Sequence, residues 1–599
     1  MTQATDILNF ISNILLLMIA WFLLAVSFFV WGRFFAKFLG IIIKNKKSVI
    51  LNIWLGFAFC IFFFSIYHLF LPINAFASCL FYFPGIIYFF LKYSKKLPEF
   101  IKSIGRQNII VILLTLFAAS AIAIQVPTNF DTGLYHLNSI RWNNEFHIIK
   151  GIGNLHSRLG FNQTFFLYCA SLNFHPFLND YAFHVSNSFL YALFFVGMIL
   201  NGTIIDLMLT ALFFFIPMPY HWITSPTPDM ASTLIQIVSF RYILEAFHFF
   251  PQSKDRLGFI SFAAILCAIL ITIKLSNIFY AAGLGIVTII FNFKYKFESI
   301  EKKQLSKTFI FIGSFFLIWF IRGYTQTGYP LFPSSIGKIN FQWTIPKDLA
   351  NKMENNVYAG SRSCETTFDI NSPILKNYAW IPLWLKRNFY DKEIYAGENW
   401  FDNFEIIITL LLFPSTVNNW GIGSITLSTL SLALLIIWFI SAIKNKESLK
   451  KPSMLFYLLL IEICSIVFWF CLAPCPRFAN GLFVILFSTS ILIIKTAYPE
   501  LTLNKKLKSA LLFFSLFLFL WNFNLAYSAQ EFIIDGIKPL APIPMRTFIT
   551  HSGLKILIPP KGVAQCWDSP ILSTIEPKDN LALLGSNIED GFYLINNSN

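Results

Sequence analysis

Charged side chains are scarce in this sequence: they make up 13% of its 599 residues, whereas 56% are hydrophobic. A water-soluble protein carries about 25% charged residues, so the composition excludes an ordinary soluble enzyme. Apolar runs of roughly 17 to 25 residues recur along the chain, and each is long enough to cross about 30 Å of hydrocarbon as a helix. The sequence therefore predicts an all-α polytopic membrane protein.

Motifs for metals and cofactors are missing as well. The nine cysteines include no CxxC pair and no metal-ligand spacing. No GxGxxG segment follows a predicted strand, and there is no P-loop. The first residues, MTQATDILNF, contain Asp6 and lack the basic region of a cleavable signal peptide. We therefore expect no metal and no cofactor, and we expect the first apolar run to be a membrane span.

The apolar runs predict about fourteen transmembrane helices. They cover residues 7–30, 49–71, 74–91, 108–126, 183–200, 203–219, 229–249, 257–274, 277–293, 308–322, 421–443, 453–473, 478–495 and 509–526. We assign residues 1–526 to a transmembrane helical domain with large loops at 127–182 and 323–420, and residues 527–599 to a tail. The tail's short runs KILIPP and LALLGS predict a small α+β or irregular cap.

Two segments within the second large loop have membrane-surface character. The run 404–413 is apolar but too short to span a bilayer, which predicts an interfacial or re-entrant helix. Residues 374–393 interleave aromatic and basic side chains, as is typical of a helix at the lipid headgroups. A soluble cap helix fits that composition equally well.

Lysine and arginine collect in alternate loops, beginning with the loop after the first predicted span, and they far outnumber the acidic residues there. The positive-inside rule places these loops in the cytoplasm, so both large loops and the tail face outward. On the outward side, basic and acidic residues are nearly balanced. The net charge of +15 is therefore a topology signal, and it indicates contact with anionic lipid rather than with nucleic acid.

Five isolated ionisable residues adjoin apolar runs on the predicted outer side. Asp131 follows the fourth predicted span, and Asp229 in SPTPD begins the seventh. Lys274 lies in ITIKLSN, Arg322 in IRGYTQTGYP and Arg477 in APCPRFANG. Charges in such places cost free energy and are usually functional. Their convergence on one face predicts a site, although snorkelling of single side chains and a wet loop over the bundle are alternatives.

A carboxylate beside several cations at a membrane surface suits group transfer from a lipid-linked phosphate. The cations suit a phosphate or pyrophosphate, to which arginine gives bidentate contacts. The carboxylate suits a general base that removes the proton of an attacking hydroxyl. At the membrane midplane Glu462 is the main buried candidate. An ion-coupled transporter would place several carboxylates there, so the pattern favours chemistry at the outer surface.

This arrangement resembles the GT-C superfamily of polytopic glycosyltransferases, which use polyprenyl-phosphate-linked sugars. Asp131 in NFDTGLYH matches the loop acid that follows an early span in that superfamily, although here three further predicted spans come before the span that it follows, and no second acid adjoins it. The segments GIGNLHSRLGFN, SPTPD, TIKLS, TGYPLFP and PCPRF also resemble an uncharacterised bacterial family of polytopic membrane proteins. The resemblance implies a glycosyltransferase of the bacterial inner (plasma) membrane, active on the periplasmic or extracellular face.

On this reading the enzyme moves a sugar from a polyprenyl-phosphate donor to a hydroxyl of a lipid, glycan or protein acceptor. Asp131 is the expected base, and Asp229 orients it or binds a sugar hydroxyl. The expected ligands of the donor phosphate are Lys274, Arg322 and Arg477. The expected acceptor or sugar pocket consists of Tyr135, His136, Asn154, His156 and Arg158. A lone loop histidine is more often structural, and interfacial anchoring is the commoner use of such aromatic residues.

Three readings compete with this one. A surface-polysaccharide polymerase or ligase would use similar cations, a flippase or transporter of lipid-linked glycans would need a polar path through the membrane, and a structural protein would leave the outer polar set unexplained. Cys364, Cys475 and Cys566 lie in predicted outer segments, where a disulfide is permitted. The sequence leaves open which two would pair, and whether they are reduced.

Overall fold

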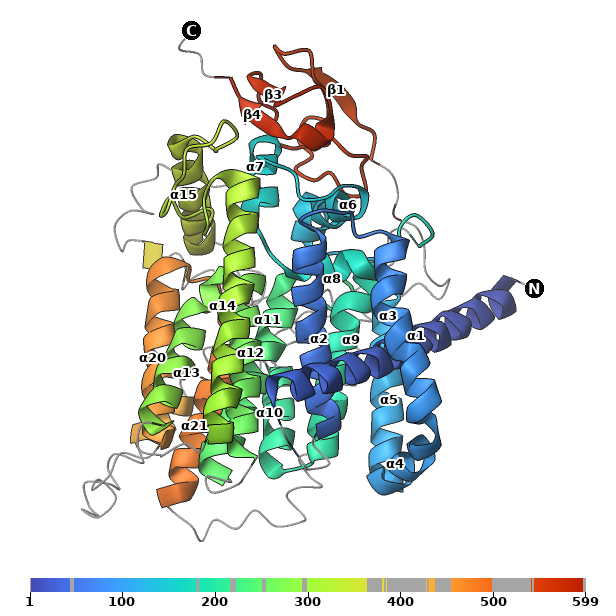
Figure 1. The fold of residues 1–599 in the computed structure, drawn as a ribbon, viewed down its shortest axis with the longest axis vertical. Helices are drawn as coiled ribbons and strands as arrows, with labels where there is room; N and C mark the ends of the chain where they lie inside the picture. The colour runs from blue at the N-terminus through green and yellow to red at the C-terminus, as the bar shows by residue number, and fades with distance from the viewer. Residues whose placement is uncertain are drawn as a thin grey trace, which may run out of the picture.

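The computed structural model of the protein describes residues 2–41, 43, 48–178, 182–215, 222–249, 255–292, 299–363, 380–381, 384, 427, 430–436, 454–497, 540 and 543–595. These residues form a bundle of long helices that carries a few short strands at one end (Figure 1). The predicted segments 404–413 and 509–526, and most of 374–393 and 421–443, lie outside the described residues.

Twelve helices make up the described part of the bundle. They are α1 (Thr2–Leu39), α2 (Ser48–Tyr67), α3 (Ala75–Lys92), α5 (Arg106–Ala123), α9 (Ala182–Asn201), α10 (Ile204–Phe215), α11 (Pro228–Leu244), α12 (Arg256–Ile273), α13 (Ile278–Asn292), α14 (Ser299–Thr327), α20 (Met454–Leu472) and α21 (Asn480–Ala497). Short helices connect them: η1 (Ser94–Lys96), α4 (Leu97–Ile104), η5 (Glu245–Phe249), η6 (Leu275–Asn277) and η9 (Pro476–Phe478).

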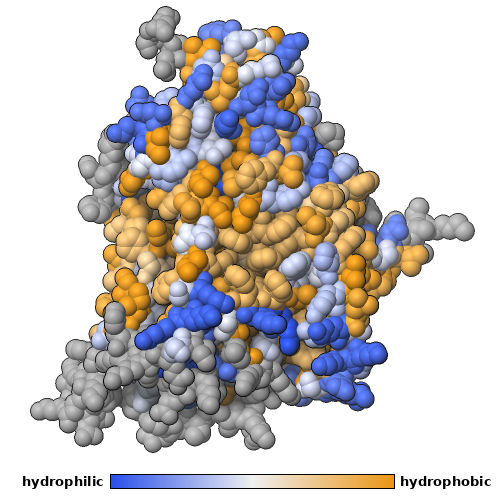
Figure 2. All heavy atoms as spheres, viewed as in Figure 1, coloured by the Kyte–Doolittle hydropathy of each residue, from blue (hydrophilic) through white to orange (hydrophobic). Residues whose placement is uncertain are grey.

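Within the described residues, 8 helices are long and apolar enough to cross a membrane: α1, α2, α3, α5, α9, α12, α14 and α20. The helices α10, α13 and α21 contain shorter apolar segments. Figure 2 shows a hydrophobic band across the middle of the face in view, between hydrophilic residues above and below. The chain is therefore a multi-pass α-helical membrane protein. The number of about fourteen spans stays a prediction, because two of the predicted spans lie largely outside the described residues.

The end of the bundle that bears the strands is called the cap end below. It carries α6 (Leu137–Glu145), α7 (Ile152–Leu155) and α15 (Lys347–Ser363) (Figure 1). The segment between α5 and α9 also contains η2 (Thr132–His136), η3 (Ser157–Phe161) and α8 (Phe165–Leu172). It is not a wet loop: the side chains of Leu134, Trp142 and Tyr168 are all buried.

The tail forms two small antiparallel hairpins on the cap end. Strand β1 (Arg546–Ile549) pairs with β2 (Lys555–Ile558), and β3 (Leu581–Leu583) pairs with β4 (Phe592–Leu594). A single short helix, η10 (Ile588–Asp590), precedes β4. The predicted runs KILIPP and LALLGS thus form β2 and β3. Ile556, Leu581 and Phe592 pack with Trp142 and Leu155 in one apolar cluster, which joins the tail to the segment between α5 and α9.

Helix α11 lies at the centre of the bundle. Every one of its residues is buried, and it packs against α9, α12 and α21. A helix that is buried on all sides needs no lipid-facing stripe, so it can carry polar side chains along its length. Its first turn, at the cap end, holds Asp229.

Helices α1 and α2 approach each other backbone to backbone. A Cβ added at Gly56 would collide with the carbonyl of Phe28, and one added at Gly32 would collide with the carbonyl of Asn52. Small residues permit such close crossings in membranes, where dispersion contacts rather than water exclusion hold helices together. The α1–α2 pair therefore depends on glycine at these two positions.

We expect Gly56→Ala to lower the thermal unfolding midpoint of the purified protein in detergent, because the added methyl group forces the two backbones apart. Overpacking of this kind costs about 1–3 kcal/mol. Gly313→Ala in α14 is the matched control, since a Cβ there meets open space. Its midpoint should stay the same or rise, because alanine favours the helix over glycine by about 1 kcal/mol. Equal midpoints for the two variants would contradict the packing described.

Candidate functional site

Asp131 is the N-cap residue of η2, the short π-helix that follows α5. The backbone N–H of Asp131 donates to Asn129 Oδ1 at 2.9 Å, which forms a local turn at this point of the chain. The Thr132 hydroxyl bonds the Ser225 hydroxyl at 2.6 Å. These contacts hold the start of η2 against the segment that leads into α11.

Asp229 is fixed by the turn that starts α11. Pro228 occupies the first turn of the helix, and the Thr227 hydroxyl accepts the N–H of Asp229 at 3.3 Å. The side-chain amide of Asn187 on α9 donates to the carbonyls of Ser225 and Thr227, at 2.6 and 2.8 Å. A proline start is preorganised for a helix, and the positive end of the helix dipole favours a carboxylate.

The two cations come from separate turns between helices. Lys274 ends α12, where its backbone N–H donates to Leu270 O at 3.0 Å. Arg477 lies in η9, the single turn between α20 and α21. Trp469 Nε1 donates to the carbonyl of Cys475 at 2.8 Å and so holds this turn over the end of α20.

Four of the five residues predicted to converge do meet. Arg477 Nη1 lies 3.0 Å from Asp131 Oδ2, and Arg477 Nε lies 3.7 Å from Asp229 Oδ2. Lys274 Nζ forms an ion pair with Asp229 Oδ1 and lies 3.6 Å from the ring centre of Phe478. Asp131, Arg477, Asp229 and Lys274 are called the ion-pair network below. Its two carboxylates balance its two cations.

The open end of the network is the pair Asp131–Arg477. Their side chains are 19% and 29% exposed, whereas that of Asp229 is 6% exposed. Burial would raise the pKa of Asp131, but the charge of Arg477, aided by His136 and Arg158, lowers it below its usual value. Asp131 is therefore ionised near neutral pH. Its basicity stays weak while Arg477 holds it.

Arg322, the fifth predicted residue, does not join the network. Its Nη1 lies 3.1 Å from His68 Nδ1, and the residue is 2% exposed. It lines a pocket between α6, the segment 152–166 and α14. This arginine pocket is lined by Ser139, Trp142, Asn143, Ile152, Arg158, Leu159, Phe161, Asn162, Gln163, Phe166, Arg322 and Gln326. Arg322 lies near the end of α14, which packs against α2 and η3 rather than against α11. The sequence does not show which neighbours a helix end will have.

Tyr135 and His136 are buried on η2, between the ion-pair network and the arginine pocket. Their ring centres are 4.5 Å apart, and each ring packs on Phe166 of the pocket wall. Burial lowers the pKa of His136 to about 3, with the charge of Asp131 opposing the shift and that of Arg477 adding to it. His136 is therefore a neutral imidazole at neutral pH.

Asn154 and His156, also predicted to line a substrate pocket, contact the tail instead. The Asn154 side-chain amide donates to Phe592 O at 3.3 Å, and His156 Nε2 lies 3.7 Å from Glu576 Oε1. Glu576 also accepts the Ser157 hydroxyl at 2.6 Å. Neither Asn154 nor His156 lines the arginine pocket, because their side chains contact Phe592 and Glu576 of the tail. Arg158, two residues on, does line it.

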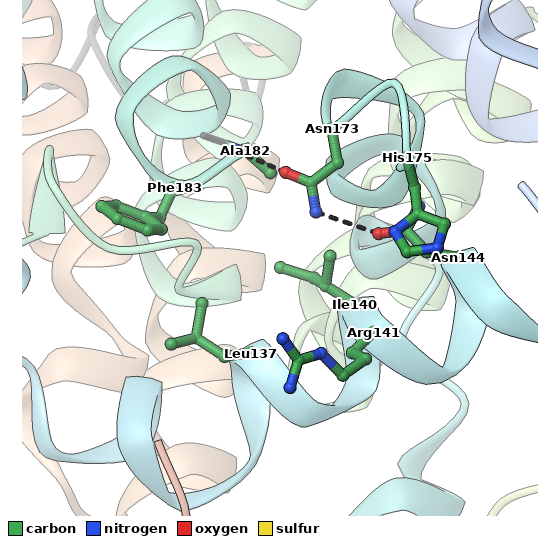
Figure 3. A pocket seen from close by; sticks show the side chains of 8 residues that line it. All are labelled: Leu137, Ile140, Arg141, Asn144, Asn173, His175, Ala182 and Phe183. Carbon is green, nitrogen blue, oxygen red and sulfur yellow. Dashed lines mark hydrogen bonds between the residues drawn. The ribbon is translucent and has the colours of Figure 1, made fainter. Parts of the chain in front are cut away.

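A second pocket opens on the other face of α6, beside the chain that leads into α9 (Figure 3). Its lining side chains are Leu137, Ile140, Arg141, Asn144, Asn173, His175, Ala182 and Phe183. Asn173 donates to Asn144 Oδ1 at 2.9 Å and accepts the N–H of Ala182 at 2.8 Å. The positions 137, 140, 141 and 144 share one helical face, while 139, 142 and 143 face the arginine pocket, so α6 separates the two pockets.

Sequence reasoning missed the four amide side chains of the arginine pocket, namely Asn143, Asn162, Gln163 and Gln326. One signal was present: Gln326 lies four residues after Arg322, which places both on one helical face. Cys475 and Cys566 are free thiols, and Cys364 lies outside the described residues. Trp380 and Trp384 do not anchor at a lipid surface, since both are buried against Phe470.

Comparisons with known proteins identify one family. A family model described as a domain of unknown function (DUF8201) matches residues 14–416. The matched stretch holds Asp131, Asp229, Lys274 and the arginine pocket, and Arg477 and the tail follow it. Neither the search of curated proteins nor the search of solved structures found a match.

The balance of the ion-pair network is testable by a double-mutant cycle. Lys274→Met should destabilise the protein by about 3–5 kcal/mol, because it removes the nearest cation from the buried carboxylate of Asp229. Adding Asp229→Asn should recover most of that loss, since the remaining groups no longer include an uncompensated buried charge. The measurement is the thermal unfolding midpoint in detergent for the two single variants and the double variant. Additive losses would show that the two side chains are not coupled.

The contact of His156 with the tail predicts a pH dependence of stability. Burial lowers the pKa of His156 to about 4, although Glu576 opposes the shift. The unfolded chain then binds more protons, so stability is full above about pH 6.5 and falls as the pH drops toward 4, by on the order of 3 kcal/mol. His156→Gln should reduce this dependence in thermal unfolding curves, whereas the part that comes from the buried His136 should remain. His551→Gln, an exposed histidine of the same tail, should leave it unchanged, and an equal effect of both changes would refute the assignment.

Proposed function

This chain belongs to the family described as a domain of unknown function (DUF8201), and we propose that it is a membrane glycosyltransferase of the GT-C type. It moves a sugar from a polyprenyl-phosphate carrier to a hydroxyl acceptor at the cap end of the bundle. The observation that carries the proposal is the pairing of the part-exposed Asp131, which follows the apolar helix α5, with Arg477, which follows the apolar helix α20. A fully structural ion pair would not need an open carboxylate at this place.

In the proposed reaction, Asp131 is the base. Arg477 engages Oδ2, and no described residue donates to Oδ1, which is left to accept a proton. The acceptor oxygen bonds the anomeric carbon as its proton passes to Asp131, while the bond from that carbon to the phosphate oxygen breaks. The electron pair leaves with the polyprenyl phosphate. One carboxylate suffices for this inverting displacement.

Arg477 links donor binding to base strength. In the resting structure its guanidinium lowers the pKa of Asp131 and so weakens the base. A donor phosphate that approaches Arg477 competes with Asp131 for the same N–H groups. Asp131 then becomes a stronger base only when the donor is present. Asp229 and Lys274 act as positioning residues, because they hold Arg477 from the buried side.

A second candidate is transport of a lipid-linked glycan, and the polar side chains of α11 favour it. Gln236 donates to Asn277 Oδ1, and Tyr280 donates to the carbonyl of Gln236 at 3.1 Å. Farther along, Arg241 Nε lies 2.6 Å from Asp206 Oδ1, and Arg241 also pairs with Glu245. Such groups mark polar paths in transporters, but they also bind helices to one another.

The test is Asp131→Asn in purified protein reconstituted into vesicles with polyprenyl-phosphate-linked radiolabelled sugars and a mixture of candidate hydroxyl acceptors. Transfer should fall by about 10²–10⁴-fold, the usual contribution of a general base. Asp568→Asn makes the same change at a cap-end carboxylate that pairs with Arg141, outside the network, and should retain transfer. Transfer retained in Asp131→Asn would show that Asp131 is not the base. Passage of the donor across the bilayer without transfer would favour transport.

A further inference from the structure

Arg322 is a buried cation without a carboxylate. It is 2% exposed, its Nη1 lies 3.1 Å from Nδ1 of His68, and its Nε has no hydrogen-bond acceptor among the described residues. No ion pair to Arg322 exists within the described ranges. Burying a charge in this way costs several kcal/mol unless something compensates it. A protein that keeps such a charge at the edge of the membrane keeps it for a partner of opposite sign.

Arg158 brings a second guanidinium to the same pocket. It comes from η3, on the wall opposite α14, and is partly exposed. Among the residues that the structure covers, none forms a hydrogen bond or an ion pair with it. Asp131 is close enough for Arg158 to affect its pKa, but its carboxylate is engaged by Arg477. The pocket thus holds two guanidinium groups, and neither is neutralised within it.

The rest of the lining is also short of hydrogen-bond partners. The buried atoms Trp142 Nε1, Asn162 Oδ1, Gln163 Oε1 and Gln326 Oε1 all have none. Buried polar groups are nearly always paired, so several orphans around one cavity point to a missing polar occupant. The orphans include acceptors as well as donors. An anion alone satisfies only the donors, whereas a ligand that also carries hydroxyl groups satisfies both.

The apolar part of the lining is largely aromatic. Trp142, Phe161 and Phe166 present aromatic groups to the pocket. Aromatic faces pack on the C–H faces of sugars, while the amide groups around them bond the hydroxyls. Arginine forks match the geometry of phosphate oxygens. The lining as a whole therefore has the chemistry of a site for a phosphorylated sugar.

The lipid side of α14 is next to this pocket. Leu317 and Ile321 are 61% and 44% exposed, and Ile321 directly precedes Arg322. These two side chains are four residues apart and form an apolar face on one side of α14. Arg322 and Gln326 line the pocket from the adjacent side of the same helix. An acyl or prenyl chain lying along that face would bring a phosphate headgroup to the level of Arg322.

We propose that the arginine pocket binds the phosphate of a hydroxyl-bearing phosphate ester, with Arg158 and Arg322 on the phosphate and the amides of Asn162, Gln163 and Gln326 on the hydroxyls. The identification of this ligand with the glycosyl donor rests on the proposed function; the phosphate site itself does not. The pocket adjoins the ion-pair network through Tyr135 and His136, whose rings pack on its wall. Arg158 and Arg322, rather than Lys274, then hold the phosphate before reaction.

Equilibrium binding to the full-length protein in lipid nanodiscs tests the proposal. The probes are radiolabelled polyprenyl phosphate and radiolabelled inorganic phosphate, compared between wild type, Arg158→Gln and Arg322→Met. Each change should weaken phosphate binding by about tenfold or more, because each removes a charge-assisted contact. Arg141→Gln, the same loss of charge on the opposite face of α6, is the control and should bind as wild type does.

The thermal unfolding midpoint without ligand is the second measurement. Arg322→Met removes an uncompensated charge, so it should raise the midpoint, whereas a purely structural arginine would lower it. If that variant does not fold, the part-exposed Arg158→Gln carries the binding test alone. If the arginine variants lose binding of the lipid probe alone, the ligand is a lipid-linked phosphate. If they lose binding of both probes, the pocket is a general phosphate site. Either result supports the pocket.

Unchanged binding of both probes in both arginine variants overturns the proposal, as does a wild type that binds neither. The outcome separates from that of the transferase assay. Phosphate binding that depends on Arg158 and Arg322, without any sugar transfer, would keep the pocket and remove the enzyme. Sugar transfer that survives both arginine changes would keep the enzyme and reject the pocket as the donor site.

Discussion

The ion pair between Arg477 and Asp131 is the contact on which the rest of the site depends. It joins the turn between α20 and α21 to the start of η2, at a separation of 346 residues in the chain. Lys274 and Asp229 continue the network inward, so that the turns beginning α11 and ending α12 are held in the same place. Each charge lies beside apolar helix ends, where an unpaired ion would cost several kcal/mol. Balanced pairing therefore fixes the relative positions of four turns.

The arginine pocket next to it has the opposite character. Its two guanidinium groups have no carboxylate within it, and its buried amide oxygens have no donors. A network that is satisfied stabilises the fold, whereas one that is not satisfied is kept at a cost and awaits a ligand. Tyr135 and His136, which follow Asp131 on η2, pack on Phe161 and Phe166 of the pocket wall and so connect the two sites. A phosphate bound by Arg158 and Arg322 would thus lie beside a carboxylate that can take a proton.

Part of this arrangement follows from the sequence. Asp131, Asp229, Lys274 and Arg477 each adjoin an apolar run on the same predicted side, and a single polar surface is the least costly place for all four. Arg322 has the same sequence signature, yet it faces α2 and η3, because the rotation of a helix about its axis depends on packing that hydropathy does not encode. The contacts of Asn154 and His156 with Phe592 and Glu576 span more than 400 residues of chain, so no local pattern could indicate them. The strands of the tail, in contrast, follow from short apolar runs bounded by glycine and proline.

The most direct test of the central claim is an electron density map of the protein with polyprenyl phosphate bound. The account predicts phosphate density between Arg158 and Arg322, within hydrogen-bond distance of about 3 Å of both guanidinium groups, with the hydrocarbon chain leaving along α14. Ordered lipid whose phosphate lies elsewhere, with no phosphate density between Arg158 and Arg322, would contradict it.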